Sequence, residues 1–169
     1  MIFKPDIIHT VNDNLLKTEQ EIPGYQLAQF QLLINELFQC CQERMQFQSE
    51  KFHLPDAEIR CLMLFGDDRY LTPKGISYKM NVVKSRVTKI IEGLVQKKLV
   101  QRVKDPEDSR VTLLSLTPEG QKKINIIKEF LKYIQLETMR QLTPEQRKMM
   151  LSSLDLLRSS MKAVKELMV

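Results

Sequence analysis

The tripeptide Leu-Thr-Pro occurs three times in the chain, at residues 71–73, 116–118 and 142–144. In each copy the threonine can act as an N-cap, because its hydroxyl accepts a hydrogen bond from a free backbone N–H of the first helical turn. The proline fits the first helical position, where no backbone donor is needed. At Thr143 a capping box is completed by Gln146, three residues later. The sequence therefore predicts three helix starts, and the residues after each copy differ, so the recurrence is not an internal repeat.

Hydrophobic spacing around these starts predicts the other elements. Apolar residues recur at helical spacing from Phe30 to Met45, which indicates a long amphipathic helix over about residues 25–49. The remaining predicted helices span about 55–65, 73–80, 83–97, 118–139 and 144–167, and the predicted strands span 99–103 and 111–116. We therefore expect a mainly α fold with a small β-wing.

The order of the middle elements predicts a winged helix-turn-helix. Two short helices, 73–80 and 83–97, are separated by a tight turn at Asn81, and a β-hairpin follows them. In such a unit the second helix can enter the major groove of DNA. Its predicted buried face consists of Val87, Ile90, Ile91 and Leu94.

Basic residues gather in this middle part of the chain. Residues 69–110 hold 11 of the 26 Lys and Arg residues, but only four of the 21 Asp and Glu residues. Concentrated positive charge favours a polyanionic partner, and side chains that donate or accept hydrogen bonds can contact phosphates and base edges. The predicted DNA-binding residues of the second helix and the hairpin are Lys84, Ser85, Arg86, Thr88, Lys89, Arg102 and Lys104.

Three other interpretations stay open at this point. A basic helix face can be an ordinary solvated surface. A winged helix can bind another protein instead of DNA, which mobility shifts with random and genomic duplexes would distinguish. The three cysteines also leave open a protein that responds to thiol oxidation.

The segment 71–120 resembles the MarR (multiple antibiotic resistance regulator) family of transcription factors. The resemblance rests on "VTKIIEGLVQKKLVQR", on an acid-x-Arg wing ("DSR") and on "LTPEG", in that order. It implies a homodimer that binds an inverted-repeat operator of double-stranded DNA and represses transcription. It also implies three regions: an N-terminal arm and dimerisation helix (1–54), the DNA-binding winged helix-turn-helix (55–117), and C-terminal dimerisation helices (118–169).

The resemblance also assigns roles to two wing residues. Arg110 stands where the family's wing arginine enters the minor groove, and Asp108 would hold its side chain in place. A narrow minor groove has a strong negative potential that attracts a guanidinium group. The chain departs from the family pattern at Lys98, where glycine is usual, at Lys89, where arginine is frequent, and at Val83, where a polar cap is usual.

Several functional classes lack support in the sequence. The chain has two histidines, no glycine-rich phosphate loop and no nucleophile motif, so we expect neither an enzyme nor a cofactor or metal site. The three cysteines are odd in number, and two are adjacent, which favours a reducing cytoplasm. No apolar run is long enough to cross a membrane, and no secretory signal is expected.

The resemblance suggests that a small amphipathic ligand releases the DNA. The predicted apolar lining of its pocket is Phe38, Met45, Met63 and Phe65, although core packing is an alternative role for each of them. Control by oxidation of Cys40, Cys41 or Cys61 is the competing mechanism. Cys40 and Cys41 occupy successive helical positions and point about 100° apart, so one helix face cannot bury both.

Overall fold

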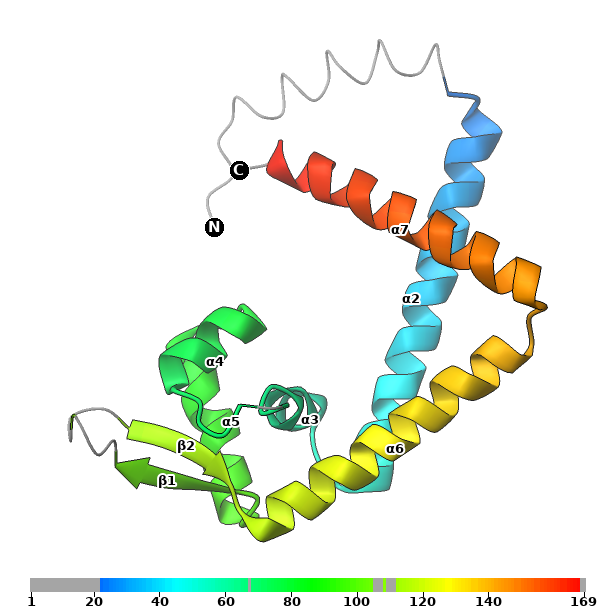
Figure 1. The fold of residues 1–169 in the computed structure, drawn as a ribbon. Coiled ribbons are helices and arrows are strands. Elements are labelled where there is room, and N and C mark those ends of the chain that lie inside the picture. Colours follow the sequence, from blue (N-terminus) through cyan, green and yellow to red (C-terminus); the bar gives the residue numbers. More distant parts are fainter. Residues whose placement is uncertain (1–21, 67, 105–107, 109–111, 168–169) are drawn as a thin grey trace. The chain divides into compact units, whose positions relative to one another are not determined.

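The computed structural model describes residues 22–66, 68–104, 108 and 112–167. The chain forms two compact units. One unit consists of Met1–Cys41 and Glu137–Val169, and the other consists of Gln42–Leu136. Two long helices, α2 (Gly24–Phe52) and α6 (Pro118–Arg140), contribute residues to both units. The boundaries after Cys41 and after Leu136 therefore both fall inside a continuous helix (Figure 1).

The unit Gln42–Leu136 contains the predicted winged helix-turn-helix. Its helices α3 (Asp56–Met63), α4 (Pro73–Met80) and α5 (Lys84–Gln96) are followed by strands β1 (Val100–Lys104) and β2 (Thr112–Leu116). The strands pair antiparallel, with Val100 opposite Leu116 and Lys104 opposite Thr112. Leu71 adds a bridge to Leu114 through two backbone hydrogen bonds of 3.0 and 2.8 Å. The segment before α4 is thereby attached to the wing, and the mainly α fold with a small β-wing is confirmed.

Local capping chemistry determines where several helices begin, as predicted. The Thr72 hydroxyl accepts a hydrogen bond from the Gly75 N–H at 3.0 Å, and the Thr117 hydroxyl accepts one from the Gly120 N–H at 2.9 Å. Thr143 forms the complete capping box with the residue three positions later at the start of α7 (Pro144–Glu166). Val83 provides no side-chain cap for α5, also as predicted.

Two helix ends differ from the sequence-based boundaries. Helix α2 continues three residues past the predicted end at 49, and His53 then takes a left-handed conformation with φ of 53°. Helix α3 ends at Met63 rather than at 65. The next two backbone N–H groups, of Leu64 and Phe65, donate to carbonyls three residues back, which tightens the last turn.

The end of α5 has a left-handed residue that is not glycine. The Lys98 N–H donates to the Val95 carbonyl and the Leu99 N–H donates to the Leu94 carbonyl, each at 2.9 Å. These are the two hydrogen bonds of a Schellman motif, whose left-handed position is usually glycine. Lys98 occupies that position with φ of 58°.

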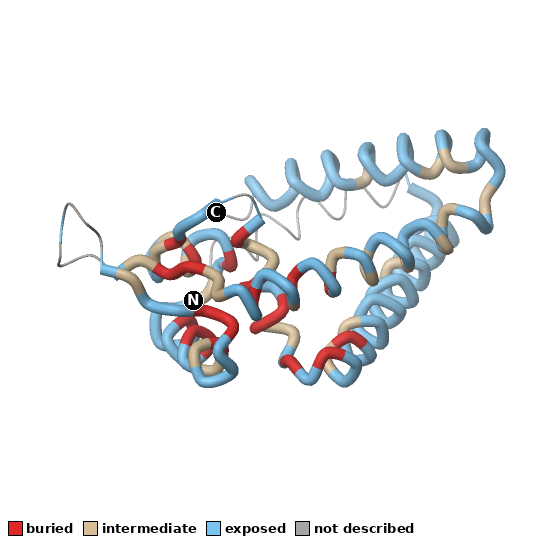
Figure 2. Tube along the Cα trace, turned by 60° about the horizontal axis from the view of Figure 1, so that its bottom comes forward, coloured by how far each residue is buried: buried red, intermediate tan, exposed pale blue. Residues whose placement is uncertain are grey.

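The hydrophobic core of this unit lies between the three short helices, the wing and α6. Val87, Ile90, Ile91 and Leu94 form the buried face of α5, as predicted from their spacing. Other buried residues of the core include Leu62, Ile76, Leu114 and Ile127. Burial is concentrated in this unit, whereas α7 is exposed along most of its length (Figure 2).

The second unit presents apolar side chains to solvent. Helix α7 has no buried residue, and a hollow within this unit is lined by Phe30 of α2 together with Leu157, Met161 and Val164 of α7. The apolar residues left exposed on the two helices include Phe30, Leu33, Leu37, Leu154, Met161 and Val164. In the described part of the chain, no helix is sufficiently long and apolar to span a membrane.

Candidate nucleic-acid interface

Helix α5 separates its polar residues from its apolar residues. Its buried face packs on α3 and α4, and the opposite side is exposed to solvent. All five predicted DNA-contacting residues of this helix are exposed: Lys84, Ser85, Arg86, Thr88 and Lys89. The amphipathic pattern thus places two lysines, one arginine and two hydroxyls together on the outside of the second helix of the helix-turn-helix.

The turn between α4 and α5 holds this helix in a defined orientation. Asn81 ends α4 in the left-handed region, with φ of 53° and ψ of 49°, which asparagine tolerates better than most residues. The Ser77 hydroxyl donates to the Val82 carbonyl at 2.7 Å, and the Val82 N–H donates to the Ser77 carbonyl at 3.2 Å. These side-chain and backbone bonds close the turn from both sides. They orient α5 relative to α4.

The start of α5 adds positive character to this surface. Its N-cap residue, Val83, is in an extended conformation and makes no side-chain cap hydrogen bond. Free N–H groups and the helix dipole make such an end attractive to a phosphate. The Thr88 hydroxyl, by contrast, donates to the Lys84 carbonyl at 3.1 Å, so this donor is engaged within the helix in the free protein.

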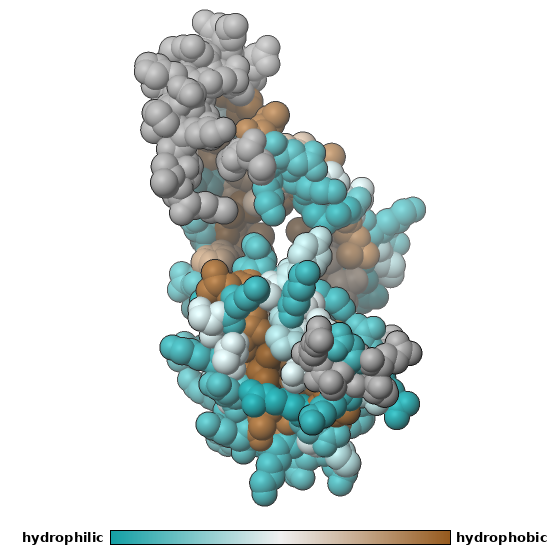
Figure 3. Space-filling model, turned by 90° about the vertical axis from the view of Figure 1, so that its left-hand side faces the viewer, coloured by the Kyte–Doolittle hydropathy of each residue, from teal (hydrophilic) through white to brown (hydrophobic). Residues whose placement is uncertain are grey.

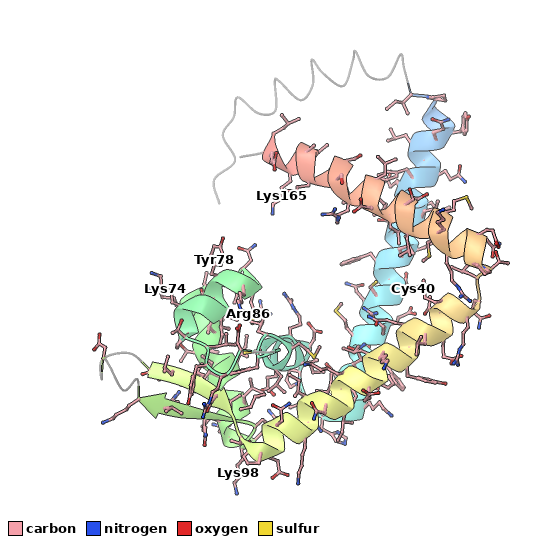
Figure 4. The ribbon with its side chains drawn as sticks, viewed as in Figure 1. Cys40, Lys74, Tyr78, Arg86, Lys98 and Lys165 are labelled. Carbon is pink, nitrogen blue, oxygen red and sulfur yellow. The ribbon has the colours of Figure 1, made fainter. Side chains whose placement is uncertain are left out.

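Sequence reasoning missed two residues of α4 beside this surface. Lys74 and Lys84 line the same hollow, together with Thr72, Val87 and Thr112, where the starts of α4, α5 and β2 meet. Tyr78 is 89% exposed. Figure 4 labels these two residues of α4 together with Arg86 of α5. The sequence indicated Lys74 and Tyr78 only weakly, because both lie off the periodic apolar positions that predict α4 and neither belongs to a motif.

The wing residues are only partly described. Arg102 and Lys104 lie on β1 and are exposed, as expected for residues that contact phosphates. Asp108 is exposed as well, whereas Arg110 lies outside the described residues. The contact of Arg110 with the minor groove therefore stays a prediction.

Hydrophilic side chains surround a narrow apolar strip on the side of the molecule that carries α4 and the hairpin (Figure 3).

The four predicted pocket residues differ in their surroundings. Phe65 is 1% exposed and belongs to the core, so a ligand would have to displace core contacts to reach it. Met45 and Met63 are half-buried, and Phe38, in the other unit, is 60% exposed. The ligand pocket remains a prediction.

The cysteines fall into two kinds. Cys40 and Cys41 are both exposed on α2, whereas Cys61 is buried. Burial, and to a smaller extent the neighbouring Glu58 charge, raises the pKa of the Cys61 thiol to about 12. Since the thiolate is the reactive form, Cys61 is a poor candidate for oxidation. Within the described ranges, no group of three His, Cys, Asp or Glu side chains could hold a metal ion.

Known proteins share the winged helix-turn-helix described above. The model of the MarR family matches residues 54–112. The HTH-type transcriptional repressor MdtR of Bacillus subtilis (strain 168) is 34% identical over 94 residues, which are 56% of this chain and 61% of MdtR. The chain spans about three fifths of the length of the first curated relatives it matches.

Solved structures extend the likeness beyond the winged helix-turn-helix. The crystal structure of YusO from Bacillus subtilis is 29% identical, covers 85% of this chain and 99% of its own, and has a TM-score of 0.65. The structure of Streptococcus pneumoniae FabT in complex with DNA has a TM-score of 0.72, covers 80% of this chain and 99% of its own, and at 20% identity shares the fold. The matching residues, the order of the elements and these neighbours identify residues 54–112 as a winged helix-turn-helix domain of the MarR type.

Proposed function

We propose that the chain is a sequence-specific regulator of transcription that binds double-stranded DNA, and that it acts as a repressor. The observation that carries the proposal is the exposed set Lys84, Ser85, Arg86, Thr88 and Lys89 on a helix whose other face is packed into the core. MdtR, the relative with 34% identity, is a transcriptional repressor, and FabT has been crystallised with DNA.

In the proposed complex, the first turns of α5 enter the major groove. Arg86 can donate two hydrogen bonds to one guanine, which makes it the strongest candidate for reading a base. Lys84, Lys89 and the wing lysine Lys104 are more suited to phosphates, which they attract as point charges. Arg110 of the wing would reach the minor groove, with Asp108 bracing it.

The exposed apolar residues of α2 and α7 support a homodimer. Large side chains such as Phe30, Leu37 and Met161 are about half exposed in the single chain, and contiguous apolar surface of this kind marks an interaction site. Two copies joined through these helices would present two α5 helices to half-sites about 10 bp apart. An inverted-repeat operator would match the two-fold symmetry of such a dimer.

Release of the DNA by a small amphipathic ligand is the finer part of the proposal. The half-buried Met45 and Met63 are the members of the predicted lining that a ligand could reach with least disturbance of the core. The exposed Cys40 and Cys41 keep the thiol-based alternative testable. DNA release by an apolar anion should survive replacement of all cysteines by serine.

The test compares variants on two duplexes. The first is the sequence that the wild-type chain selects from a randomised pool, and the second is a duplex of unrelated sequence. Arg86→Ala should weaken binding to the selected duplex by about 1–3 kcal/mol and reduce the preference between the two. Lys104→Ala should weaken both alike and reduce the slope of log affinity against log salt by about one.

Lys132→Ala is the matched control, because it removes one positive charge from an exposed position of α6. It should change neither the preference nor the salt slope. Equal losses for Arg86→Ala and Lys104→Ala on both duplexes would contradict the assignment of Arg86 to base reading. A folded chain that binds no duplex would favour the protein-interaction alternative.

A further inference from the structure

A carboxylate lies buried between α3 and the DNA-reading helix. Glu58 of α3 has only 8% of its side chain exposed, and its Oε1 atom accepts a hydrogen bond from Lys97 Nζ at 2.9 Å. Its second oxygen, Oε2, is buried and has no hydrogen-bond partner among the residues that the structure describes. A buried carboxylate with one of its oxygens unsatisfied is not stabilising, since the ion pair does not fully repay the loss of hydration.

The facing position on α5 is a glycine in the helix interior. A Cβ atom at Gly93 would overlap Glu58 Oε1 and would lie 3.2 Å from its Cδ and 3.8 Å from Lys97 Nζ. Glycine is unfavourable inside a helix because it loses the most conformational freedom on folding. Here the missing side chain leaves the space that the Glu58 carboxylate occupies.

Glu58 and Gly93 are each unfavourable for stability by themselves, and together they form one contact between α3 and α5. The carboxylate needs the space at Gly93, and Lys97, one turn later on the same side of α5, holds the carboxylate there. A buried carboxylate and a glycine inside a helix each lower stability, and in natural proteins such unfavourable choices occur mainly at functional positions. The contact joins α3 to α5, which pack directly on each other, and a contact of this kind can restrain the rotation of α5 against α3.

The contact lies on the side of the helix that carries the base-reading candidate. Arg86 is two turns before Gly93, and residues seven apart in a helix lie on nearly the same side. Lys98, just past the helix, lies at the other end of α5 from Arg86 (Figure 4). A rotation of α5 about its axis would therefore move the Arg86 guanidinium sideways along the DNA surface.

We propose that Glu58 is a positioning residue for DNA recognition, acting through Lys97 and through the space at Gly93 without touching DNA. This inference rests on the proposed DNA-binding function. Glu58 fixes the rotation of α5, and thereby determines how well Arg86 and its neighbours meet the base edges. Losing it affects the preference for the selected duplex more than the general attraction to phosphates.

The first test is Glu58→Gln, which keeps the side-chain shape and removes its charge. Affinity for the duplex selected by the wild type should fall by about tenfold, which lies within the range of effects for residues that act on a ligand without contacting it. Affinity for an unrelated duplex should stay equal or rise slightly, because the variant is more positive. Glu129→Gln, at an exposed position of α6, makes the same charge change and should leave the preference intact.

The second test uses the space at the glycine. Gly93→Ala should reduce the preference by pushing the carboxylate aside, and adding Glu58→Gln should cause little further loss, because both changes act on the same contact. Thermal unfolding of every variant, measured without DNA, separates misplacement from unfolding. An unchanged preference in both Glu58→Gln and Gly93→Ala, with all proteins folded, overturns the proposal.

Failure of the proposed function gives a different result. A wild-type chain that selects no sequence overturns DNA recognition itself. The positioning role is then judged from the backbone amide chemical shifts of residues 84–96 in the free protein. Shifts throughout this helix in Glu58→Gln, absent in Glu129→Gln, support positioning, and a helix that does not respond overturns it.

Discussion

Lys98→Gly should stabilise the protein, because Lys98 is held in a conformation that a side chain disfavours. The two hydrogen bonds that end α5, from the Lys98 and Leu99 N–H groups, are donated by the backbone and survive the substitution. The change therefore isolates the strain of a Cβ atom at φ of 58°. A left-handed residue other than glycine costs about 1–2 kcal/mol.

Part of this gain is lost in the unfolded chain. Glycine makes the unfolded state more flexible, which offsets about 0.4–1 kcal/mol. The net stabilisation expected for Lys98→Gly is thus about 0.5–1 kcal/mol, or roughly 2 °C in the midpoint of thermal unfolding for a chain of this size. Urea unfolding at fixed protein concentration measures it, since association also contributes to stability.

Lys98→Ala is the necessary control, because it removes the charge and keeps the Cβ atom. The alanine variant should be no more stable than the wild type, and the difference between the glycine and alanine variants reports the strain minus the cost of glycine's flexibility in the unfolded chain. If the two variants unfold at the same urea concentration, the left-handed backbone is not strained and the reasoning is refuted.

Three other outcomes are expected. Gly120→Ala should destabilise the protein by about 3 kcal/mol, because its Cβ would overlap the backbone carbonyl of Leu99, whereas Gly24→Ala, which meets nothing within 4 Å, should be nearly neutral in the same unfolding assay. The pKa of Cys61 rises from 9.0 to about 12 on folding, so the unfolded chain loses this proton first, and the free energy of unfolding should fall as the pH rises above 9. The Cys61→Ala variant should lose less stability over that range. An identical pH profile for the two proteins would refute the burial argument. Deleting residues 144–169 should abolish dimerisation or folding, and a stable truncated dimer in sedimentation measurements would contradict the role given to α7.

Features that depend on neighbouring residues could be predicted from the sequence. Thr72 and Thr143 cap helices because the donors they satisfy are three residues away, and Asn81 turns the chain by its own backbone preference. The buried face of α5 followed from spacing alone, since Val87 and Leu94 recur at the helical period. The same spacing placed the candidate DNA-binding residues on the outside.

Features that depend on distant residues could not be predicted. Glu58 and Gly93 are far apart in the chain, and each has an ordinary interpretation by itself: a surface carboxylate and a weak helix former. Only the packing of α3 on α5 makes them partners. The end of α2 also escaped prediction, because its last turn has no glycine or proline to mark it, and the left-handed residue there is a histidine.

The two helices shared by the compact units determine how the protein can be dissected. A protease or a gene truncation usually separates domains at a flexible linker, but here the division after Cys41 and that after Leu136 both fall inside a helix. Cutting a helix leaves up to four carbonyls without partners on the N-terminal side of the cut and up to four N–H groups without partners on the C-terminal side. A fragment that carries the candidate nucleic-acid interface should therefore be prepared with α2 and α6 whole.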